Sequence, residues 1–299
     1  MISTIARKEF TELGRDGRFR WSAGIVLALL TVAVLAGAHH QRALRAQQAT
    51  AQAEELHRWY HQPDKNPHSG AHYGFYVFKP RLAPGFIDPG VEPYTGIGTW
   101  LEAHYQNEMV FRPAADATPA QRFGELTVAL ALQVMLPLVI VLLAFNAFAG
   151  ERERGTLRQL LSLGLPPRAL VLGKMLGALG ALAIVVVPAL VLGGVAIVTT
   201  DAGAAAGRFA VMAVAYLIYL GVFLFVALAV SARAPSPRFA LVALLGFWAA
   251  NCLFAPRAVG DVAAFVHPLP DPVVLRASIK NGIGDPHGAP AKLQQRVAA

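Results

Sequence analysis

Five long apolar runs dominate this chain, and none of them contains Asp, Glu, Lys, Arg or His. They lie at residues 21–38, 126–148, 175–199, 209–230 and 239–254. A helix needs roughly 20 predominantly apolar residues to cross about 30 Å of hydrocarbon. Most of the runs reach that length, and the first and last are a little short. The pattern predicts an all-α polytopic membrane protein with about five transmembrane helices.

Composition and charge support this prediction. Hydrophobic residues make up 55% of the chain and charged residues 15%, which is outside the usual range of soluble domains. The net charge of +8 comes mainly from short basic segments beside the apolar runs, which the positive-inside rule places in the cytosol. Because this charge lies at membrane ends and forms no single basic groove, nucleic acid is not expected as a partner. The chain is expected to lie in a lipid bilayer.

The alternation of basic and neutral segments predicts the domain layout. It comprises a cytosolic amphipathic N-terminal helix at 1–20, a transmembrane helix at 21–38, an extracytoplasmic insert at 39–125, transmembrane helices two to five at 126–254 with a cytosolic coupling element at 149–174, and an extracytoplasmic tail at 255–299. Two alternatives stay open. Ala36-Gly37-Ala38 is compatible with a cleaved signal peptide, and the fifth run is compatible with an interfacial or re-entrant segment.

The insert reads as a small mixed α/β domain. Residues 43–60 are rich in helix-forming residues, and "GFYVF" alternates as a short strand does. Gly and Pro residues between 80 and 98 predict turns.

The segment "GERERGTLRQLLSLGLPPRALVLGK", residues 150–174, predicts a cytosolic helical hairpin. Gly155 interrupts the helix, and Thr156 to Gln159 fit a capping box that starts a second one. Leu157, Leu160 and Leu161 then share a face, and Gly164 with two prolines ends the helix. Such an amphipathic helix either lies on lipid or docks into the groove of a partner protein.

This segment resembles the loop between the second and third spans of ABC type 2 transporter permeases. The residues that carry the resemblance are Glu151, Glu153, Gly155, Thr156, Leu157, Leu160, Leu161, Pro166, Gly173 and Lys174. The ATPase coupling that it implies is assigned to the first seven of them. The resemblance implies a permease subunit of an exporter in the bacterial inner membrane. It also implies a separate ABC ATPase subunit that binds ATP and Mg²⁺, and a second permease copy or paralogue.

Residues 71–108 resemble the extracytoplasmic region of a bacterial subfamily of these permeases, which has a large insert between the first two spans. Members of that subfamily are usually longer. The resemblance therefore implies that either the chain is truncated after its fifth span or the fifth run does not cross the membrane.

Motifs for chemistry are missing from the sequence. A phosphate-binding loop needs Gly-x-x-x-x-Gly-Lys-Ser/Thr, but Gly173-Lys174 is followed by Met175. Because the apolar runs hold no ionisable residue, an ion-coupled carrier is disfavoured. We expect no catalytic residue and no cofactor in this chain. The alternative function is a membrane-anchored extracytoplasmic domain that binds a metal or a protein partner.

Histidines are the candidates for that alternative. His57, His61, His68 and His72 fall in one short stretch, and the first two have the i,i+4 spacing that places two imidazoles on one helical face. Because Pro63 and Pro67 interrupt the helix and no second ligand motif follows, a surface role is favoured and no metal site is predicted.

Small, kinking and polar residues within the spans predict how the helices pack. Gly173, Gly177 and Gly180 have the spacing that permits close helix approach, and Pro137 and Pro188 predict kinks. The strongest polar side chains at membrane depth are Gln133, Asn146 and Asn251, for which interhelical hydrogen bonds are expected.

Overall fold

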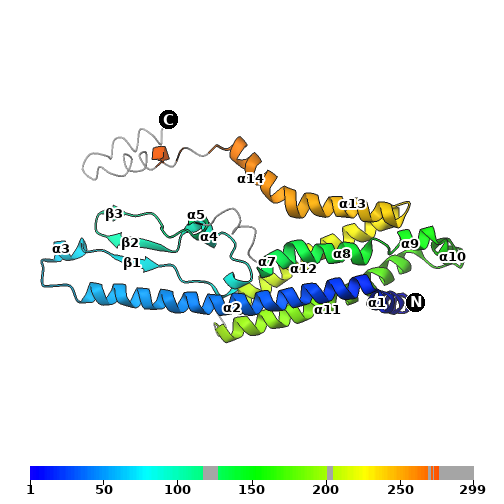
Figure 1. Cartoon of the computed structure of the whole chain (residues 1–299), viewed down its shortest axis with the longest axis horizontal. Helices are drawn as coiled ribbons and strands as arrows, with labels where there is room; N and C mark the ends of the chain where they lie inside the picture. Colours follow the sequence, from blue (N-terminus) through cyan, green and yellow to red (C-terminus); the bar gives the residue numbers. More distant parts are fainter. Residues whose placement is uncertain (117–126, 201–204, 269–270, 272, 276–299) are drawn as a thin grey trace. The chain divides into compact units, whose positions relative to one another are not determined.

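The computed structural model describes residues 1–116, 127–200, 205–268, 271 and 273–275 (Figure 1). The chain divides into two compact units, Met1–Trp248 and Ala249–Ala299. Among the described residues, five helical segments are long and apolar enough to cross a membrane, namely Gly17–Tyr60, Val128–Glu153, Pro167–Thr200, Ala206–Arg233 and Pro237–Val266. The predicted all-α polytopic fold with a small mixed α/β insert is confirmed. The predicted first residue of the second span, 126, lies outside the described residues.

The elements follow one another along the chain. They are α1 Ile2–Arg15, α2 Gly17–Tyr60, α3 Pro67–Ala71, β1 Phe75–Phe78, η1 Ala83–Phe86, α4 Glu92–Thr95, β2 Gly98–Glu102, β3 Tyr105–Gln106, α5 Pro113–Asp116, α7 Val128–Leu130, the π-helical turn η2 Ala131–Met135, α8 Leu136–Ala144, α9 Ala149–Glu153, α10 Thr156–Ser162, α11 Pro167–Thr200, α12 Ala206–Arg233 and α13 Pro237–Ala249. In the second unit, the π-helical turn η3 Ala250–Phe254 completes the predicted fifth run, and α14 Ala255–Val266 lengthens the helical segment beyond it.

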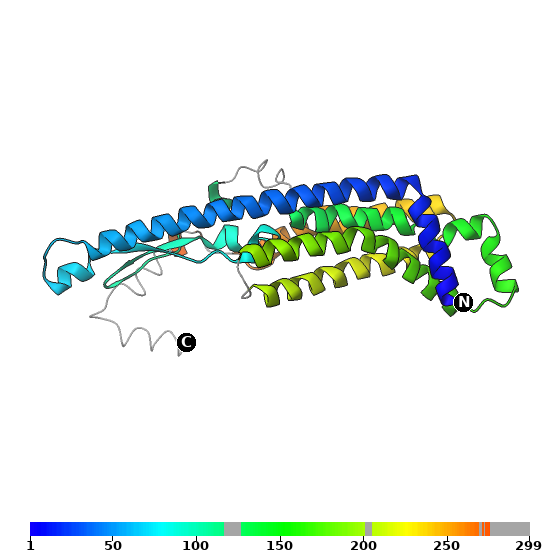
Figure 2. The same ribbon diagram turned by 90° about the horizontal axis from the view of Figure 1, so that it is seen from below.

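The N-terminal helix α1 is separated from α2 by Asp16, which has an extended backbone conformation. The Asp16 carboxylate accepts hydrogen bonds from the Arg18 backbone N–H and from the Arg18 guanidinium, both at 2.8 Å. Asp16 is thus the N-cap of α2. Figure 2 shows that α1 turns away from the line of α2 at this point.

Helix α2 continues well beyond the predicted end of the first span at residue 38. It is one α-helix of 44 residues, which at 1.5 Å per residue corresponds to roughly 66 Å. Its first half carries the apolar run and buries Leu30 and Val34. Its second half is polar and lies along the insert (Figure 1).

The insert contains a three-stranded antiparallel sheet with the order β1-β2-β3. The free edge of β1 is covered by side chains from one face of α2. Gln52 accepts from the Phe78 N–H at 3.0 Å and donates to the Tyr76 carbonyl at 3.3 Å. Glu55 accepts from the Tyr76 N–H at 2.9 Å. Because an uncovered edge strand pairs readily with other chains, these bonds both attach the sheet and protect it.

The second span contains a π-helical turn, η2, directly before Pro137. Proline has no N–H to bond the carbonyl four residues earlier, so the Gln133 carbonyl is left free. The Tyr219 hydroxyl of α12 donates to that oxygen at 2.8 Å. The Trp248 indole N–H of α13 donates to the neighbouring Val134 carbonyl, also at 2.8 Å. The irregular turn is therefore satisfied by neighbouring helices, as backbone at membrane depth requires.

Candidate functional site

The hairpin between the second and third spans begins with α9 and turns at Gly155. Gly155 has φ +76°, in the left-handed region that glycine adopts at least cost. The predicted capping box is wrong, because Gly155 is the N-cap of α10 and no side chain caps it. Thr156 is already the first helical residue, and its hydroxyl donates to the Glu151 carbonyl at 3.2 Å.

Helix α10 ends where the sequence predicted. Gly164 has φ +81°, the Leu165 N–H donates to the Leu160 carbonyl at 3.2 Å, and α11 begins at Pro167. This is a glycine-terminated helix end with its last carbonyls satisfied.

The leucines of α10 differ in exposure. Leu157 and Leu160 are half-buried, whereas Leu161 is 42% exposed and Leu163, just after the helix, is 83% exposed. Leu163 was not among the predicted coupling residues, although it continues their pattern. The exposed apolar surface of the hairpin is therefore centred on Leu161 and Leu163.

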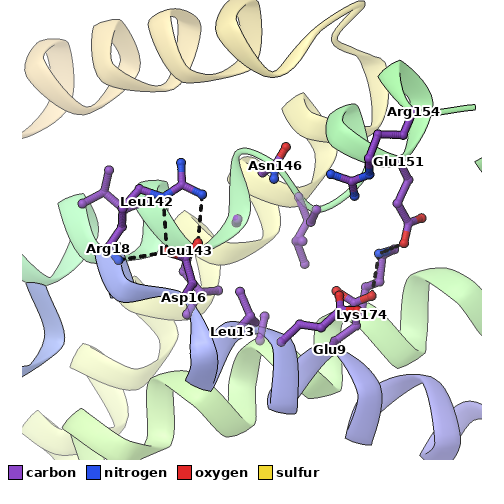
Figure 3. Close-up of a pocket in the computed structure, with 15 residues that line it drawn as sticks. Glu9, Leu13, Asp16, Arg18, Leu142, Leu143, Asn146, Glu151, Arg154 and Lys174 are labelled. Atoms are coloured by element: carbon purple, nitrogen blue, oxygen red, sulfur yellow. Dashed lines mark hydrogen bonds and ion pairs between the residues drawn. The ribbon is translucent and has the colours of Figure 1, made fainter. Parts of the chain in front are cut away.

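An ion-pair network lies at the base of this hairpin (Figure 3). Lys174 of α11 is 2% exposed, and its Nζ lies 2.8 Å from Glu151 Oε1 and 2.7 Å from Glu9 Oε1. Glu151 and Glu9 are 5% and 7% exposed. One ammonium thus joins α9, α11 and the N-terminal helix α1 in a buried place where unpaired charge is costly.

Lys8 supplies the second positive charge of the network. Its Nζ lies 3.0 Å from Glu12, 3.1 Å from Glu9 and 3.4 Å from Glu151. Partial burial favours the neutral amine, but the carboxylates of Glu12 and Glu9 outweigh it and raise the pKa of Lys8 above its usual value. The buried carboxylates of Glu9 and Glu151 are therefore balanced by two ammonium groups.

A second set of contacts attaches α9 to α12. The Arg152 guanidinium donates to the Ala232 and Ala234 carbonyls, at the C-terminal end of α12 where cations are stabilising. Buried Ser231 accepts from the Phe148 N–H at 3.0 Å and donates to the Phe145 carbonyl at 2.8 Å. Ser231 therefore satisfies the backbone where the second span breaks between α8 and α9.

The predicted packing glycines of α11 contact α1. A Cβ at Gly173 would lie 2.5 Å from Ile5 Cβ, and one at Gly177 would lie 2.6 Å from Glu9 Cβ. At Gly180 the nearest atom is a ring carbon of Phe10 at 3.1 Å. The three glycines thus let the short N-terminal helix approach the third span closely. Pro188 lies inside α11, and the helix continues through it without a break. The predicted kink at Pro188 stays a prediction.

A cavity of about 110 Å³ adjoins the network. Its lining includes Glu9, Asp16, Arg18, Asn146, Glu151 and Lys174, six of the residues drawn in Figure 3. Within the described part of the chain, Glu151 Oε2 is buried and has no hydrogen-bond partner. A polar cavity of this size accommodates water, which would satisfy that oxygen.

Residues 3–275 match the family described as ABC-2 family transporter protein. The chain belongs to the ABC-2 transporter family. Comparison with curated proteins gives no match. Membership and the five apolar helical segments together make the chain a multi-pass membrane permease, a transport subunit that is not an enzyme on its own.

The predicted coupling residues of this ABC-2 permease separate into two groups. Glu151 and Thr156 face inward at the base of the hairpin, where Glu151 is buried. Glu153, Gly155 and Leu161 are exposed. The prediction treated all of them as one docking element, whereas the geometry distinguishes an anchoring base from an exposed tip.

Sequence reasoning missed Glu9, and it took Lys174 as a basic residue of the cytosolic segment and as part of the family resemblance. A signal for Glu9 is present, since Ile2, Ile5, Glu9 and Leu13 follow helical spacing and Glu9 falls on the apolar face of α1. A carboxylate on that face requires a buried cation. In this permease the cation is Lys174, which lies between Gly173 and Gly177 on α11.

A second polar cluster joins the insert to the spans. The Tyr216 hydroxyl of α12 donates to Asp88 Oδ2 at 2.7 Å and accepts from the Gln133 amide at 2.8 Å. The expected interhelical hydrogen bond of Gln133 is therefore present. Asn146 lines the cavity described above, and Asn251 lies in η3 of the second unit.

The candidate histidines form two groups. The rings of His57 and His61 stack with centroids 3.9 Å apart. His68 and His72 lie beside His104, a residue that the sequence analysis did not single out.

Proposed function

We propose that this permease couples to a separate ABC ATPase through α10 and exports its substrate across the bacterial inner membrane. The observation that carries the proposal is the construction of the hairpin. Its tip exposes Leu161 and Leu163, and its base is attached by Glu151 to α1 and α11. A ridge of apolar side chains on a helix is what a groove on a partner protein grips.

The contacts of α9 indicate how movement would pass from the tip to the spans. Glu151 joins α9 to α11 through Lys174, and Arg152 joins it to the end of α12. A pull on α10 would therefore act on the third and fourth spans together. We infer that ATP binding by the partner, with Mg²⁺, shifts these helices between two arrangements.

Orientation follows from charge. The segment of α1, the hairpin and the turn between α12 and α13 are rich in Arg and Lys, which favours the cytosolic side for all three. On this basis the N-terminus is cytosolic and the insert is extracytoplasmic. Because such pathways form between two membrane halves, a second permease copy or paralogue completes the transporter.

The test is whether an ABC ATPase co-purifies with the tagged chain from its native membrane. Leu161→Asp combined with Leu163→Asp places carboxylates on the exposed tip without touching the buried base, so folding is preserved. We expect the variant to lose the ATPase while its yield and size-exclusion profile match the wild type.

The matched control is Val91→Asp in the insert, where a side chain that is 72% exposed receives the same change. It should retain the ATPase. An ATPase that stays bound to the Leu161→Asp, Leu163→Asp variant would show that α10 is not the docking element.

A further inference from the structure

Three histidines of the insert converge on one point. The ligating atoms of His68, His72 and His104 all lie within 4.8 Å of one another, and all three residues are exposed. Their ring centroids are 4.7 Å, 5.1 Å and 5.8 Å apart. They come from two separate places in the fold: His68 lies in the short helix α3 and His72 is its C-cap, whereas His104 lies in the turn between β2 and β3.

The local sequence positions the first two histidines. Asn66 caps α3 by accepting from the Ser69 N–H at 2.8 Å, and Pro67 occupies the first helical position. The His72 N–H donates to the His68 carbonyl at 3.3 Å. His68 and His72 therefore have the i,i+4 relation that places both side chains on one helical face.

The third ring is brought in by the hairpin turn. The Ala103 N–H donates to the Ala71 carbonyl at 3.1 Å, and this bond joins the residues directly before His104 and His72. His104 has φ +69°, a left-handed conformation in which Gly or Asn is the less costly choice. A histidine that bears this backbone cost is a reason to look for a role of its side chain.

The spacing fits a metal ion bound by imidazoles. In a tetrahedral site with Zn–N bonds of about 2.1 Å, ring centroids lie roughly 5 Å apart and the ligating nitrogens roughly 3.4 Å apart. The observed centroid distances span that value. The nitrogens, within 4.8 Å, reach it by rotation of exposed rings.

The pair His57 and His61 does not have this geometry. Their rings are stacked with an interplanar angle of 20° and centroids 3.9 Å apart, so their in-plane lone pairs lie in two nearly parallel planes and do not converge on one ion. His61 Nδ1 also lies 2.8 Å from the His57 carbonyl oxygen.

We propose that His68, His72 and His104 bind one divalent first-row transition ion that favours imidazole, of the class of Zn²⁺, Cu²⁺ and Ni²⁺. The cluster consists of nitrogen donors, which suit these ions and not Mg²⁺ or Ca²⁺. Three protein ligands leave one position open for water or for an exchangeable ligand. The site belongs to the insert and does not depend on the ATPase coupling proposed above.

The experiment uses the full chain in detergent, purified through an affinity tag without histidine and stripped with a chelator. Equilibrium dialysis against Zn²⁺ followed by elemental analysis gives the bound metal per chain. The wild type should bind one Zn²⁺. Asparagine also tolerates the left-handed turn, so His104→Asn removes the imidazole without disturbing the backbone. We expect this variant to bind Zn²⁺ about tenfold or more weakly, because one ligand is missing. His72→Gln should lose as much.

The matched control is the His57→Gln, His61→Gln variant, which should bind Zn²⁺ as the wild type does. The site is overturned if the wild type binds no more Zn²⁺ than a variant that lacks all three histidines. It is equally overturned if the control variant loses as much affinity as His104→Asn. Unchanged binding in His104→Asn would remove His104 from the site.

Discussion

Lys174 Nζ and Glu151 Oε1 lie 2.8 Å apart and join the two ends of the α9–α10 hairpin inside the protein. The same ammonium is 2.7 Å from Glu9 on the N-terminal helix. The base of the hairpin and the α1 helix are therefore connected by this buried ammonium, and Lys8 of α1 makes a second contact with Glu151 at 3.4 Å.

Removing this ammonium should destabilise the protein strongly. Lys174→Met keeps an unbranched apolar stem but leaves the Glu9 and Glu151 carboxylates with Lys8 as their nearest ammonium. Breaking a buried ion pair by removing one partner costs about 3–5 kcal/mol. Thermal unfolding in detergent should show a marked fall in the transition temperature.

Adding Glu151→Gln to Lys174→Met removes one of the stranded charges and should recover part of the loss. If the single variant Lys174→Met were as stable as the wild type, the conclusion that this network stabilises the fold would be wrong.

The contact between α1 and α11 predicts the effect of a single methyl group. A Cβ at Gly177 would lie 2.8 Å from the Ala6 carbonyl oxygen and 2.6 Å from Glu9 Cβ. Gly177→Ala should therefore push α1 away and cost about 1–3 kcal/mol. Faster tryptic cleavage within α1 would report the displacement.

The control is Gly221→Ala in α12, another membrane helix, because a Cβ at Gly221 would meet no atom within 4 Å. It should be neutral or slightly stabilising, since alanine favours helix. Equal cleavage rates in the two variants would rule out close packing at Gly177.

The junction between α1 and α2 should respond to acid. The hydrogen bonds from Arg18 lower the pKa of Asp16 below its usual value. A depressed carboxyl pKa stabilises the fold above the unfolded value of about 3.9, and this contribution is lost as the pH falls through the folded value. Asp16→Asn keeps an N-cap side chain without the charge.

The stability difference between wild type and Asp16→Asn should therefore be present at neutral pH and close below about pH 4. Because Asp16 is only half-buried and its partner Arg18 is exposed, the difference should stay below about 1 kcal/mol. The raised pKa of Lys8 works in the opposite direction, since its contribution persists at neutral pH and is lost only in strong alkali. A gap that widens in acid would contradict the role of Asp16.

The covered edge of β1 predicts a local effect in the insert. Gln52→Ala removes one donor and one acceptor that bond Tyr76 and Phe78. Each lost bond costs about 1 kcal/mol. Hydrogen exchange at the Phe78 amide should accelerate, whereas Gln47→Ala, an exposed glutamine on the same helix, should leave it unchanged. Equal protection in the two variants would show that α2 does not hold the strand.

The apolar runs and the turn residues of the sequence were enough to predict the spans and the C-terminal end of α10. Uninterrupted apolar runs and a Gly-x-Pro-Pro stop are local signals, and they require no knowledge of what packs against them. The missed features are all relations between distant segments. Glu9 and Lys174 each look like ordinary charged residues near a membrane surface, and only the approach of α1 to the glycines of α11 makes them a buried pair.

The histidines illustrate the same limit. Spacing along the chain favoured His57 and His61, which stack, and could not reveal His104, which the β2–β3 turn brings to His68 and His72. The capping box failed for a more local reason, because the left-handed Gly155 moved the start of α10 by one residue.

The unbroken course of α2 from Gly17 to Tyr60 has a mechanical consequence. One half of this helix carries the sheet and the other half lies in lipid. A small tilt at its N-terminal end therefore produces a large displacement at its C-terminal end. The insert therefore needs no separate chain of contacts to follow the spans, because any rearrangement that tilts the membrane-spanning half of α2 moves the insert with it.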